Sequence, residues 1–388
     1  MRRRRVCVVT GSRAEYDQLY WLLKEIEKES SLVLQLVVTG MHLSSEHGLT
    51  VTSIEEDGFT ITSKIEAMPQ DTSASSITKS VGVGLIKFSD LFKSLCPDVV
   101  VLLGDRYELF APAIATLFQR IPLVHISGGE RTDASLDELI RHSITKMASI
   151  HFVSEDAYRR RVIQLGEHPS KVMNYGDLGV ESVRRTNRIS LAEFGKKIGF
   201  DLSGSPYFLV TYHPETTKSE FISEREIQFL RALAKFPDHV ILFTGANADH
   251  GGNIINNLFR DYANRYPKKY IFVQSLGREN YIAAMTYATL VLGNSSSGIV
   301  EAPVVGIPTI NIGERQQGRI MAGSIFTCSH DTEDIVRTIT EVLLTVSQKD
   351  STVTIKGEVE YSTAKRIKDY LRDADLRYEQ KLFFDIPQ

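Results

Sequence analysis

Short runs of β-branched and other apolar residues alternate with longer amphipathic stretches along most of this chain, and this alternation constrains the fold more than any other feature. In the first half the short runs include "VLQLVVTG", "DVVVLLGD", "IPLVHISGGE" and "SIHFVSE", and helical patterns such as "YDQLYWLLKEIEKES" lie between them. Continuous apolar strands separated by helices are typical of βαβ units, whose parallel sheet is covered on both faces. The sequence therefore predicts an α/β protein.

The alternation is interrupted once, and the interruption predicts two domains. The strand signal lapses over residues 180–205 and then resumes with "YFLVTYH", "HVILFTGAN", "YIFVQSL", "TLVLGNS" and "PTINIG". A chain of 388 residues also exceeds one hydrophobic core of ordinary size. We expect two Rossmann-like parallel-sheet domains, residues 1–182 and 183–362, facing each other across a cleft. The last helical stretch, in residues 363–388, could pack back on the N-terminal domain.

Composition excludes several classes of protein. A formal net charge of -3 gives no general attraction to nucleic acids or anionic membranes. Cys7, Cys96 and Cys328 lie far apart and match no metal-ligand spacing, so neither a disulfide framework nor a structural zinc site is expected, in keeping with a reducing cytoplasm. The apolar run after "MRRRR" is too short for a signal peptide, and no run approaches the ~20 residues of a membrane span. We expect a cytoplasmic protein without nucleic-acid or membrane partners.

Polar clusters follow nearly every predicted strand. They are Ser12-Arg13, Gly104-Asp105-Arg106, Ser127 to Glu130, His213-Pro214-Glu215, Asn247, and Asn294 to Ser297. Ligands of open α/β sheets bind outside the carboxyl ends of the strands. These clusters therefore predict a ligand site built from the strand ends of both domains.

The stretch "GNSSSG", residues 293–298, suits a diphosphate. Glycine lets the backbone approach a ligand closely, and hydroxyls at the start of a helix bind anions. Glu301, one turn on, could bind sugar or ribose hydroxyls, and Arg315 and Arg319 in "GERQQGR" add positive charge. The same serines and acid would also make an ordinary helix N-cap. The chain has no Walker motif, and its one GxG stretch does not follow a strand, so an NTPase or dinucleotide enzyme is not supported.

Acidic side chains gather in the first half. Asp105 directly follows a strongly apolar strand, and Glu130 follows a Gly-Gly turn. Ser135-x-x-Glu138 reads as a capping box, which explains Glu138 structurally. Asp137, in the same first turn, could favour the helix dipole or point into the cleft.

Basic and imidazole groups lie near these acids and near the predicted phosphate site. Arg141 and His142 follow about one turn after the acids and could pair with them. His213 precedes Pro214, which holds it in an extended conformation beyond its strand. A lone histidine is otherwise more often structural, so both interpretations stand at this point.

Seven motifs together resemble one family. "TGSRAEY", "GDRYE", "GGE", "DELIRHSITK", "HPETT", "GNSSSGIVE" and "GERQQGR" occur here in the order seen in hydrolysing UDP-N-acetylglucosamine 2-epimerases, most closely the bacterial sialic-acid and legionaminic-acid pathway type. The resemblance runs from about Arg5 to Arg319. It implies a glycosyltransferase-B-like fold and the conversion of UDP-GlcNAc and water to ManNAc and UDP. It implies no cofactor and no metal, and a homo-oligomer, either a dimer or a tetramer.

The resemblance also implies roles for individual residues. Asp105, Glu130 and Asp137 would act as acids and bases, with His213 assisting at the diphosphate or leaving group. UDP or the sugar would be bound by Arg13, Arg106, Asn247, Ser295, Ser296, Glu301 and Arg315. Many relatives carry H-x-E-G-G-E where this chain has Ser127 in place of the first glutamate, so Glu130 is expected to carry the proton. The division of acid and base roles stays open.

Three alternatives remain open on the sequence. The substrate could be a UDP-2,4-diacetamido-2,4,6-trideoxy sugar, in which a methyl group replaces the C6 hydroxymethyl group. A glycosyltransferase of the same fold would bind the same donor, but its first domain normally holds a variable acceptor site rather than three clustered acids. A non-catalytic sugar-nucleotide sensor would not need both Asp105 and Asp137. Release of UDP without an acceptor separates an epimerase from the glycosyltransferase and the sensor, and comparing the turnover of the two nucleotides separates the two substrates.

Overall fold

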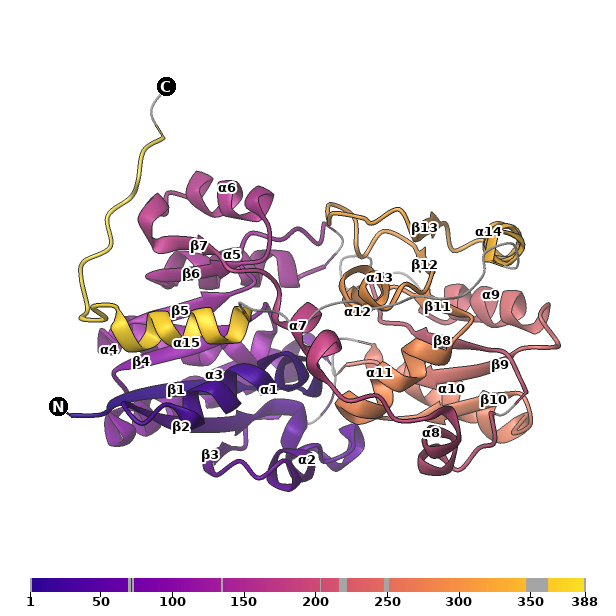
Figure 1. Cartoon of the computed structure of the whole chain (residues 1–388), viewed down its shortest axis with the longest axis horizontal. Coiled ribbons are helices and arrows are strands. Elements are labelled where there is room, and N and C mark those ends of the chain that lie inside the picture. The colour runs from indigo at the N-terminus through magenta and orange to yellow at the C-terminus, as the bar shows by residue number, and fades with distance from the viewer. Residues whose placement is uncertain are drawn as a thin grey trace. The chain divides into compact units, whose positions relative to one another are not determined.

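The computed structural model describes the chain except for residues 1, 69–70, 72, 134, 203, 216–221, 248–250, 347–361 and 387–388. Two compact units are distinguished: the first comprises Met1–Glu130, Leu136–Ser182 and Glu358–Gln388, and the second comprises Arg131–Ser135 and Val183–Gly357. Within the described residues, the first unit holds a seven-stranded parallel sheet and the second a six-stranded one (Figure 1). The predicted fold class, α/β with two Rossmann-like parallel sheets, is confirmed.

The sheet of the first unit has the strand order β3-β2-β1-β4-β5-β6-β7. The strands are β1 (Arg4–Thr10), β2 (Leu32–Thr39), β3 (Ile61–Ile65), β4 (Val99–Leu103), β5 (Leu123–Ile126), β6 (Ile150–Val153) and β7 (Val172–Asn174). β1 pairs with β2 on one side and β4 on the other, so the strand order reverses between β1 and β4. Such a reversal point is where open α/β sheets bind ligands, at the carboxyl ends of the strands.

Helices cover both faces of this sheet, as the alternation of side chains along β1 shows. Val6 and Val8 point to one face, with apolar residues of α1 (Arg13–Lys28) and α15 (Thr363–Asp373). Cys7 and Val9 point to the other, with α3 (Ala74–Leu95), α4 (Phe110–Gln119) and α5 (Asp137–Met147). The unit also contains α2 (Val51–Glu56), α6 (Asp156–Gln164) and the 3₁₀ turns η1 (Gly40–Leu43), η2 (Ser45–His47), η3 (Tyr107–Leu109) and η4 (Pro169–Lys171). α7 (Leu178–Arg185) runs through the boundary between the units.

The sheet of the second unit has the order β10-β9-β8-β11-β12-β13. Its strands are β8 (Tyr207–Thr211), β9 (Val240–Thr244), β10 (Tyr270–Val273), β11 (Leu290–Gly293), β12 (Thr309–Ile312) and β13 (Ile325–Cys328). The order reverses between β8 and β11, which pair in parallel. His213 follows β8 and Asn294 follows β11, so both residues lie at the reversal point.

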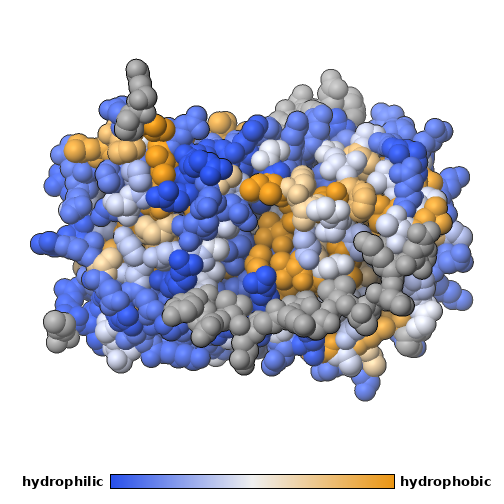
Figure 2. Space-filling view, turned by 45° about the horizontal axis from the view of Figure 1, so that its top comes forward, coloured by the Kyte–Doolittle hydropathy of each residue, from blue (hydrophilic) through white to orange (hydrophobic). Residues whose placement is uncertain are grey.

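Helices likewise cover both faces of the second sheet. One face packs against α9 (Ile222–Ala234), α10 (Gly252–Arg265) and α14 (Thr332–Val346), and the other against α8 (Leu191–Ile198), α11 (Gly277–Tyr287) and α13 (Ala302–Val305). The five-residue helix α12 (Ser296–Val300) follows β11 directly. The surface seen in Figure 2 is hydrophilic over much of its area but also carries sizeable hydrophobic areas, so not every apolar side chain is turned to a sheet.

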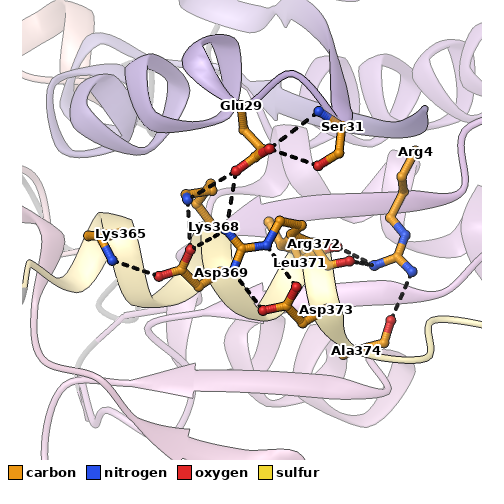
Figure 3. A network of polar contacts seen from close by, with 10 residues as sticks. All are labelled: Arg4, Glu29, Ser31, Lys365, Lys368, Asp369, Leu371, Arg372, Asp373 and Ala374. Carbon is orange, nitrogen blue, oxygen red and sulfur yellow. Dashed lines mark hydrogen bonds and ion pairs between the residues drawn. The ribbon is translucent and has the colours of Figure 1, made fainter. Parts of the chain in front are cut away.

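Polar contacts anchor the last helix, α15, to the first unit (Figure 3). Glu29, at the end of α1, accepts hydrogen bonds from Lys368 at 3.3 Å and Arg372 at 3.2 Å. Arg4 of β1 donates to the carbonyl oxygens of Leu371, Arg372 and Ala374, where α15 ends. A cation at a helix C-terminus satisfies carbonyls that have no partner within the helix and interacts favourably with the helix dipole.

Candidate active site

Three of the predicted acids lie at one edge of the first sheet. Asp105 follows β4 and Glu130 follows β5, and β4 and β5 are paired neighbours. Asp137 is the first residue of α5, where the helix dipole favours a negative charge. Leu136 rather than Ser135 occupies the N-cap position, so the helix begins one residue later than the capping box predicts. The difference is small, because Leu136 already has helical dihedral angles and helix ends are defined only to within a residue or two.

Arg141 of α5 is the centre of this acid cluster. Its Nη1 donates to the carbonyl oxygen of Glu130 at 3.1 Å and to Glu138 Oε2 at 3.0 Å, and its Nη2 pairs with Asp105 Oδ2. The side chain is only 1% exposed. Burial acts to lower the pKa of Arg141, but the negative charges of Asp105, Glu130, Glu138 and Asp137 outweigh it and raise the pKa. The structure therefore gathers all three predicted acids around one buried cation.

A hydrogen-bonded histidine supports this cluster from β5. His125 Nε2 donates to the carbonyl oxygen of Gly104 at 2.7 Å, and its Nδ1 accepts from Thr145 Oγ1 at 3.0 Å. Burial lowers the pKa of His125 to about 3, so the ring is neutral and serves as a structural link. Ser127, two residues on, has a left-handed backbone (φ 64°), unusual for a residue with a side chain.

The two arginines predicted to bind substrate in this unit pair with carboxylates of the same unit. Arg13 Nη1 donates to Asp17 Oδ2 at 2.8 Å, one turn along α1. Arg106 is buried and its Nη2 lies 3.2 Å from Glu108 Oε1. Arg13 follows β1 and Arg106 follows β4, so both lie at the point where the strand order reverses.

Sequence reasoning missed Glu15, a buried acid beside these arginines. Its Oε2 accepts from the amide of Gly11 at 2.7 Å, and Ser12 caps α1 by accepting from the Glu15 amide. Burial, reinforced by the charge of Glu108, raises the pKa of Glu15 to about 8. The spacing Ser12-x-x-Glu15 is that of a capping box and was the available signal for a role of Glu15 at the helix start, although the carboxylate binds the amide of Gly11 and not that of Ser12.

In the second unit, Asn294 joins the ends of three neighbouring strands. Its Oδ1 accepts from the amide of His213 at 2.7 Å, and its Nδ2 donates to the carbonyl oxygen of His213 at 2.8 Å. The carbonyl oxygen of Asn294 accepts from Arg315 Nη1 at 3.2 Å and Gln316 Nε2 at 2.8 Å. Asn294 is fully buried. Sequence reasoning placed Asn294 among the strand-end polar residues but gave it no role.

Gly293 makes this contact possible. Its φ of 128° is one that residues with a side chain rarely adopt, and a Cβ there would overlap the carbonyl oxygen of Thr211. β11 can therefore approach the end of β8 closely enough for the amide of Asn294 to bond to the carbonyl oxygen of Thr211 at 3.2 Å. A close approach of two backbones is a common reason for glycine inside a strand.

The remaining predicted ligands lie around this point. The amide of Asn247, after β9, donates to His213 Nδ1 at 3.3 Å, so a neutral His213 ring carries its proton on Nε2. Ser295 is the N-cap of α12 and accepts from the amide of Ser297, and Ser296 is the first residue of that helix. Glu301 ends α12 and accepts a 2.7 Å hydrogen bond from Ser297 Oγ. The second unit thus connects His213, Asn247 and Arg315 through hydrogen bonds and places Ser295 and Ser296 directly after Asn294.

None of the helices that the structure describes is long and apolar enough to cross a membrane. In the same part of the chain, no group of three or more His, Cys, Asp or Glu side chains could hold a metal ion.

Comparisons with known proteins agree on one family. The family model described as UDP-N-acetylglucosamine 2-epimerase matches residues 24–372. The chain is 38% identical over 390 residues to "Polysialic acid biosynthesis protein P7" of Escherichia coli, covering 99% of this chain and 98% of that protein. It is 39% identical over 325 residues to "GDP/UDP-N,N'-diacetylbacillosamine 2-epimerase (hydrolyzing)" of Campylobacter jejuni, covering 84% of each. The crystal structure of UDP-GlcNAc 2-epimerase from Neisseria meningitidis bound to UDP-GlcNAc has the same fold, with a TM-score of 0.74, 18% identity and coverage of 95% of this chain and 99% of that one.

Proposed function

Because this chain belongs to the UDP-N-acetylglucosamine 2-epimerase family, we propose that it is a hydrolysing epimerase that converts UDP-GlcNAc and water to ManNAc and UDP, supplying sialic acid biosynthesis in the cytoplasm. The observation that carries this proposal is the gathering of Asp105, Glu130 and Asp137 around Arg141. The relative that aligns with nearly the whole chain is named for polysialic acid biosynthesis, which supports the sialic-acid assignment.

The proposed chemistry explains why several carboxylates are needed. The C2 hydrogen of the sugar is not next to a carbonyl group, so its removal must accompany departure of UDP from C1. A carboxylate takes the C2 proton, the C2–H electron pair forms the C1=C2 double bond, and the C1–O bond breaks with its electrons passing to UDP. Water then adds to C1 and loses a proton to a base, while an acid returns a proton to C2 on the opposite face. General acid–base groups of this kind contribute typically ~10²–10⁴-fold each.

Within the acid cluster, Arg141 holds two side-chain carboxyl groups and one main-chain carbonyl group in place. Its two guanidinium nitrogens bind Asp105 and Glu138 side chains and the Glu130 main chain, so a change in the position of α5 would move these groups together. We assign the acid and base roles to Asp105, Glu130 and Asp137, all within the predicted N-terminal domain, residues 1–182.

Residues of the predicted C-terminal domain, 183–362, would bind UDP. Arg315 and the hydroxyls of Ser295 and Ser296 supply donors suited to a diphosphate, and His213 would assist its departure. Glu301 would bind ribose hydroxyls, and Arg13, Arg106 and Asn247 would complete the nucleotide-sugar contacts. Charge that develops on the leaving diphosphate is stabilised best by groups that are already fixed in place. Asn294 fixes two such residues, His213 and Arg315, through hydrogen bonds.

One experiment tests the reaction. The enzyme is incubated with UDP-GlcNAc in D₂O without acceptor, nicotinamide or added metal, and the free sugar is examined by NMR. The proposal expects UDP release and a sugar of manno configuration with deuterium at C2. Retention of hydrogen at C2, or a product of gluco configuration, would contradict the elimination and re-addition mechanism.

A second substrate is favoured by a specific comparison. The 39% identity to the hydrolysing diacetylbacillosamine 2-epimerase supports UDP-2,4-diacetamido-2,4,6-trideoxyglucose as the alternative. The two nucleotides differ at C4 and C6. Measuring kcat/KM for both in one assay decides between them, since the true substrate should be turned over far faster.

We also propose that the chain forms a homo-oligomer, through exposed apolar side chains of packed helices in the first unit. Val83 and Ile86 of α3 are 44% and 68% exposed, and Leu117 and Phe118 of α4 are 44% and 80% exposed. Contiguous exposed apolar residues mark interaction surfaces. Light scattering should give a dimer or tetramer mass for the wild type and a smaller mass for Phe118→Asp; a monomeric wild type would contradict this.

A further inference from the structure

The segment after α15, Leu376–Ile386, follows a defined path on the first unit although it contains no helix or strand. Leu376 is buried in the hydrophobic cluster of that unit. The amide of Phe384 donates to the carbonyl oxygen of Gly166 at 2.9 Å. The ring of Phe383 packs where a Cβ of Gly166 would lie, and Gly166 has a φ of 87°. These contacts hold the segment against the turn that follows helix α6.

Lys381 is the point at which this segment binds α5. Its Nζ donates to the carbonyl oxygens of Thr145 at 3.2 Å, Lys146 at 2.8 Å and Ala148 at 2.5 Å. α5 ends at Met147, so these carbonyls belong to the last turn, where no partner exists within the helix. A positive charge at this end is also favoured by the helix dipole. Lys381 therefore caps α5 from a distant part of the chain.

Glu167 fixes Lys381 in that position. Its carboxylate lies 2.6 Å from Lys381 Nζ and also accepts from Lys146 at 2.7 Å and His151 at 2.9 Å. The side chain is 2% exposed. Burial acts to raise the pKa of Glu167, but His151, Lys146 and Lys381 outweigh it and lower the pKa to about 2. Lys146 and Lys381 supply the positive charge that keeps this buried carboxylate ionised, whereas burial lowers the pKa of His151, whose ring acts as a hydrogen-bond donor. Lys381 is therefore held by Glu167 as well as by the carbonyl oxygens at the end of α5.

The capped helix leads directly to the acid cluster. Asp137 and Arg141 lie on the N-terminal half of α5, and Arg141 binds Asp105 and the main chain of Glu130. Thr145, whose carbonyl Lys381 caps, also binds His125 through its hydroxyl at 3.0 Å. His125 in turn binds the carbonyl oxygen of Gly104, the residue before Asp105. Two routes of direct contacts thus join Lys381 to the acids.

We propose that Lys381 is a positioning residue for the acid cluster, and that the segment Leu376–Ile386 holds helix α5 so that Asp105, Glu130 and Asp137 keep their arrangement around Arg141. The inference rests on the proposed function, because it assigns to this segment the alignment of groups that move protons. A misplacement of about 1 Å far from the chemistry can lower a rate by about 10²-fold.

The first experiment compares Lys381→Met with Leu382→Ala in the full-length chain. Methionine keeps most of the apolar stem of Lys381 and removes the charge, and Leu382 is 76% exposed beside it. We expect kcat of Lys381→Met to fall roughly 10- to 100-fold while the inhibition constant for UDP stays within about twofold, since UDP is assigned to other residues. Lys381→Arg, which keeps a cation, should recover part of the loss, and Leu382→Ala should match the wild type. An unchanged kcat in Lys381→Met, or equal losses in kcat and UDP affinity, would overturn the proposal.

The second experiment does not depend on catalysis. Amide hydrogen exchange of residues 137–148, read by mass spectrometry, should be faster in Lys381→Met than in the wild type or Leu382→Ala, with the helices of the second unit unchanged. Equal exchange in all three proteins would remove the capping role even if the enzyme were active. Faster exchange together with a wild type that releases no UDP would instead reject the proposed function and retain the capping contact. If Lys381→Met does not fold, Lys381→Gln, which keeps one donor group, is measured in the same two assays.

Discussion

The side chain of Asn294 binds the main chain of His213 at both its amide hydrogen and its carbonyl oxygen, at 2.7 and 2.8 Å. A single residue on β11 therefore fixes the residue at the end of β8 in both position and orientation. The carbonyl oxygen of Asn294 also accepts hydrogen bonds from Arg315 and Gln316. Asn294 therefore connects His213, which we propose assists the leaving group, to Arg315, which we propose binds the diphosphate.

Replacing Asn294 should damage UDP binding as well as stability. Asn294→Ala leaves the amide and carbonyl of His213 buried without these partners, and an unsatisfied buried group costs about 1–3 kcal/mol. We expect a lower free energy of unfolding in urea and a clearly higher dissociation constant for UDP by calorimetry. Asn256→Ala is a matched control, since Asn256 binds the amide and carbonyl of Ala246 in the same way. Wild-type UDP affinity in Asn294→Ala would show that the position of His213 does not matter for the nucleotide.

Removing the side chains that Asn294 positions should affect the nucleotide directly. His213→Ala and Arg315→Ala are expected to weaken UDP binding or slow its departure, because hydrogen bonds to charged groups contribute about 1.5–3 kcal/mol each, or roughly 10- to 100-fold. Product inhibition by UDP and steady-state turnover measure the two effects separately. If both variants keep the UDP inhibition constant and kcat of the wild type, neither residue belongs to the site.

The acid cluster offers a test with an internal control. Asp105→Asn, Glu130→Gln and Asp137→Asn should each fold normally and lose activity by roughly 10²–10⁴-fold, as expected for a missing general acid or base. Glu138 binds the same Arg141 and also His142, but it is assigned no proton transfer, so Glu138→Gln should retain much more activity. UDP release from the substrate is the measurement. Near wild-type rates for Glu130→Gln would mean that a group other than Glu130 compensates for the serine that this chain has at position 127 in place of a glutamate.

Glu15 should make the stability of the fold depend on pH. Its pKa is about 8 in the folded protein and 4.5 as an ordinary glutamate, so between these values the folded protein holds a proton that the unfolded chain has lost. The contribution of Glu15 to the free energy of unfolding should therefore fall as pH rises from 4.5 to 8, by up to about 1.4 kcal/mol per pH unit. Glu15→Gln keeps an acceptor for the Gly11 amide and removes this slope.

The control for this measurement lies on the same helix. Glu27 of α1 is exposed, and Glu27→Gln removes a carboxylate from the same helix without changing the buried site around Glu15. Urea unfolding at several pH values between 4.5 and 8 gives the slopes. Parallel slopes for wild type and Glu15→Gln would show that Glu15 is ionised in the folded protein.

The order of strands and helices could be predicted because it depends on local sequence. Val99–Leu103, five apolar residues bounded by Asp98 and Gly104, forms β4 as expected, and such strands are buried on both faces by helices. Strand ends also share an edge of a parallel sheet, which is why Asp105 and Glu130 were predicted to lie near each other. Their chemical roles, like those of the UDP ligands, stay predictions.

Contacts between residues far apart in the chain could not be predicted. Arg141 lies about one helical turn after Glu138, and this spacing predicts that the two side chains pair. The bond between Arg141 and Asp105, in contrast, joins residues 36 positions apart and depends on how α5 packs on the sheet. The same is true of Lys381, whose charge alone resembles that of any exposed lysine. Periodicity reports which face of a helix is buried, not which partner it meets.

The path of the chain through the first unit has a consequence for its synthesis. Ala364, Ile367 and Leu371 of α15 belong to the hydrophobic cluster that also contains Val6 and Leu19, near the other end of the chain. A nascent chain therefore cannot complete this cluster, to which Leu376 also belongs, until residue 376 has left the ribosome, after the second unit has already emerged. Until then one face of the first sheet lacks its last covering helix, α15. We therefore expect a protease to cut the first unit far more readily in ribosome-bound chains arrested before residue 363 than in released protein.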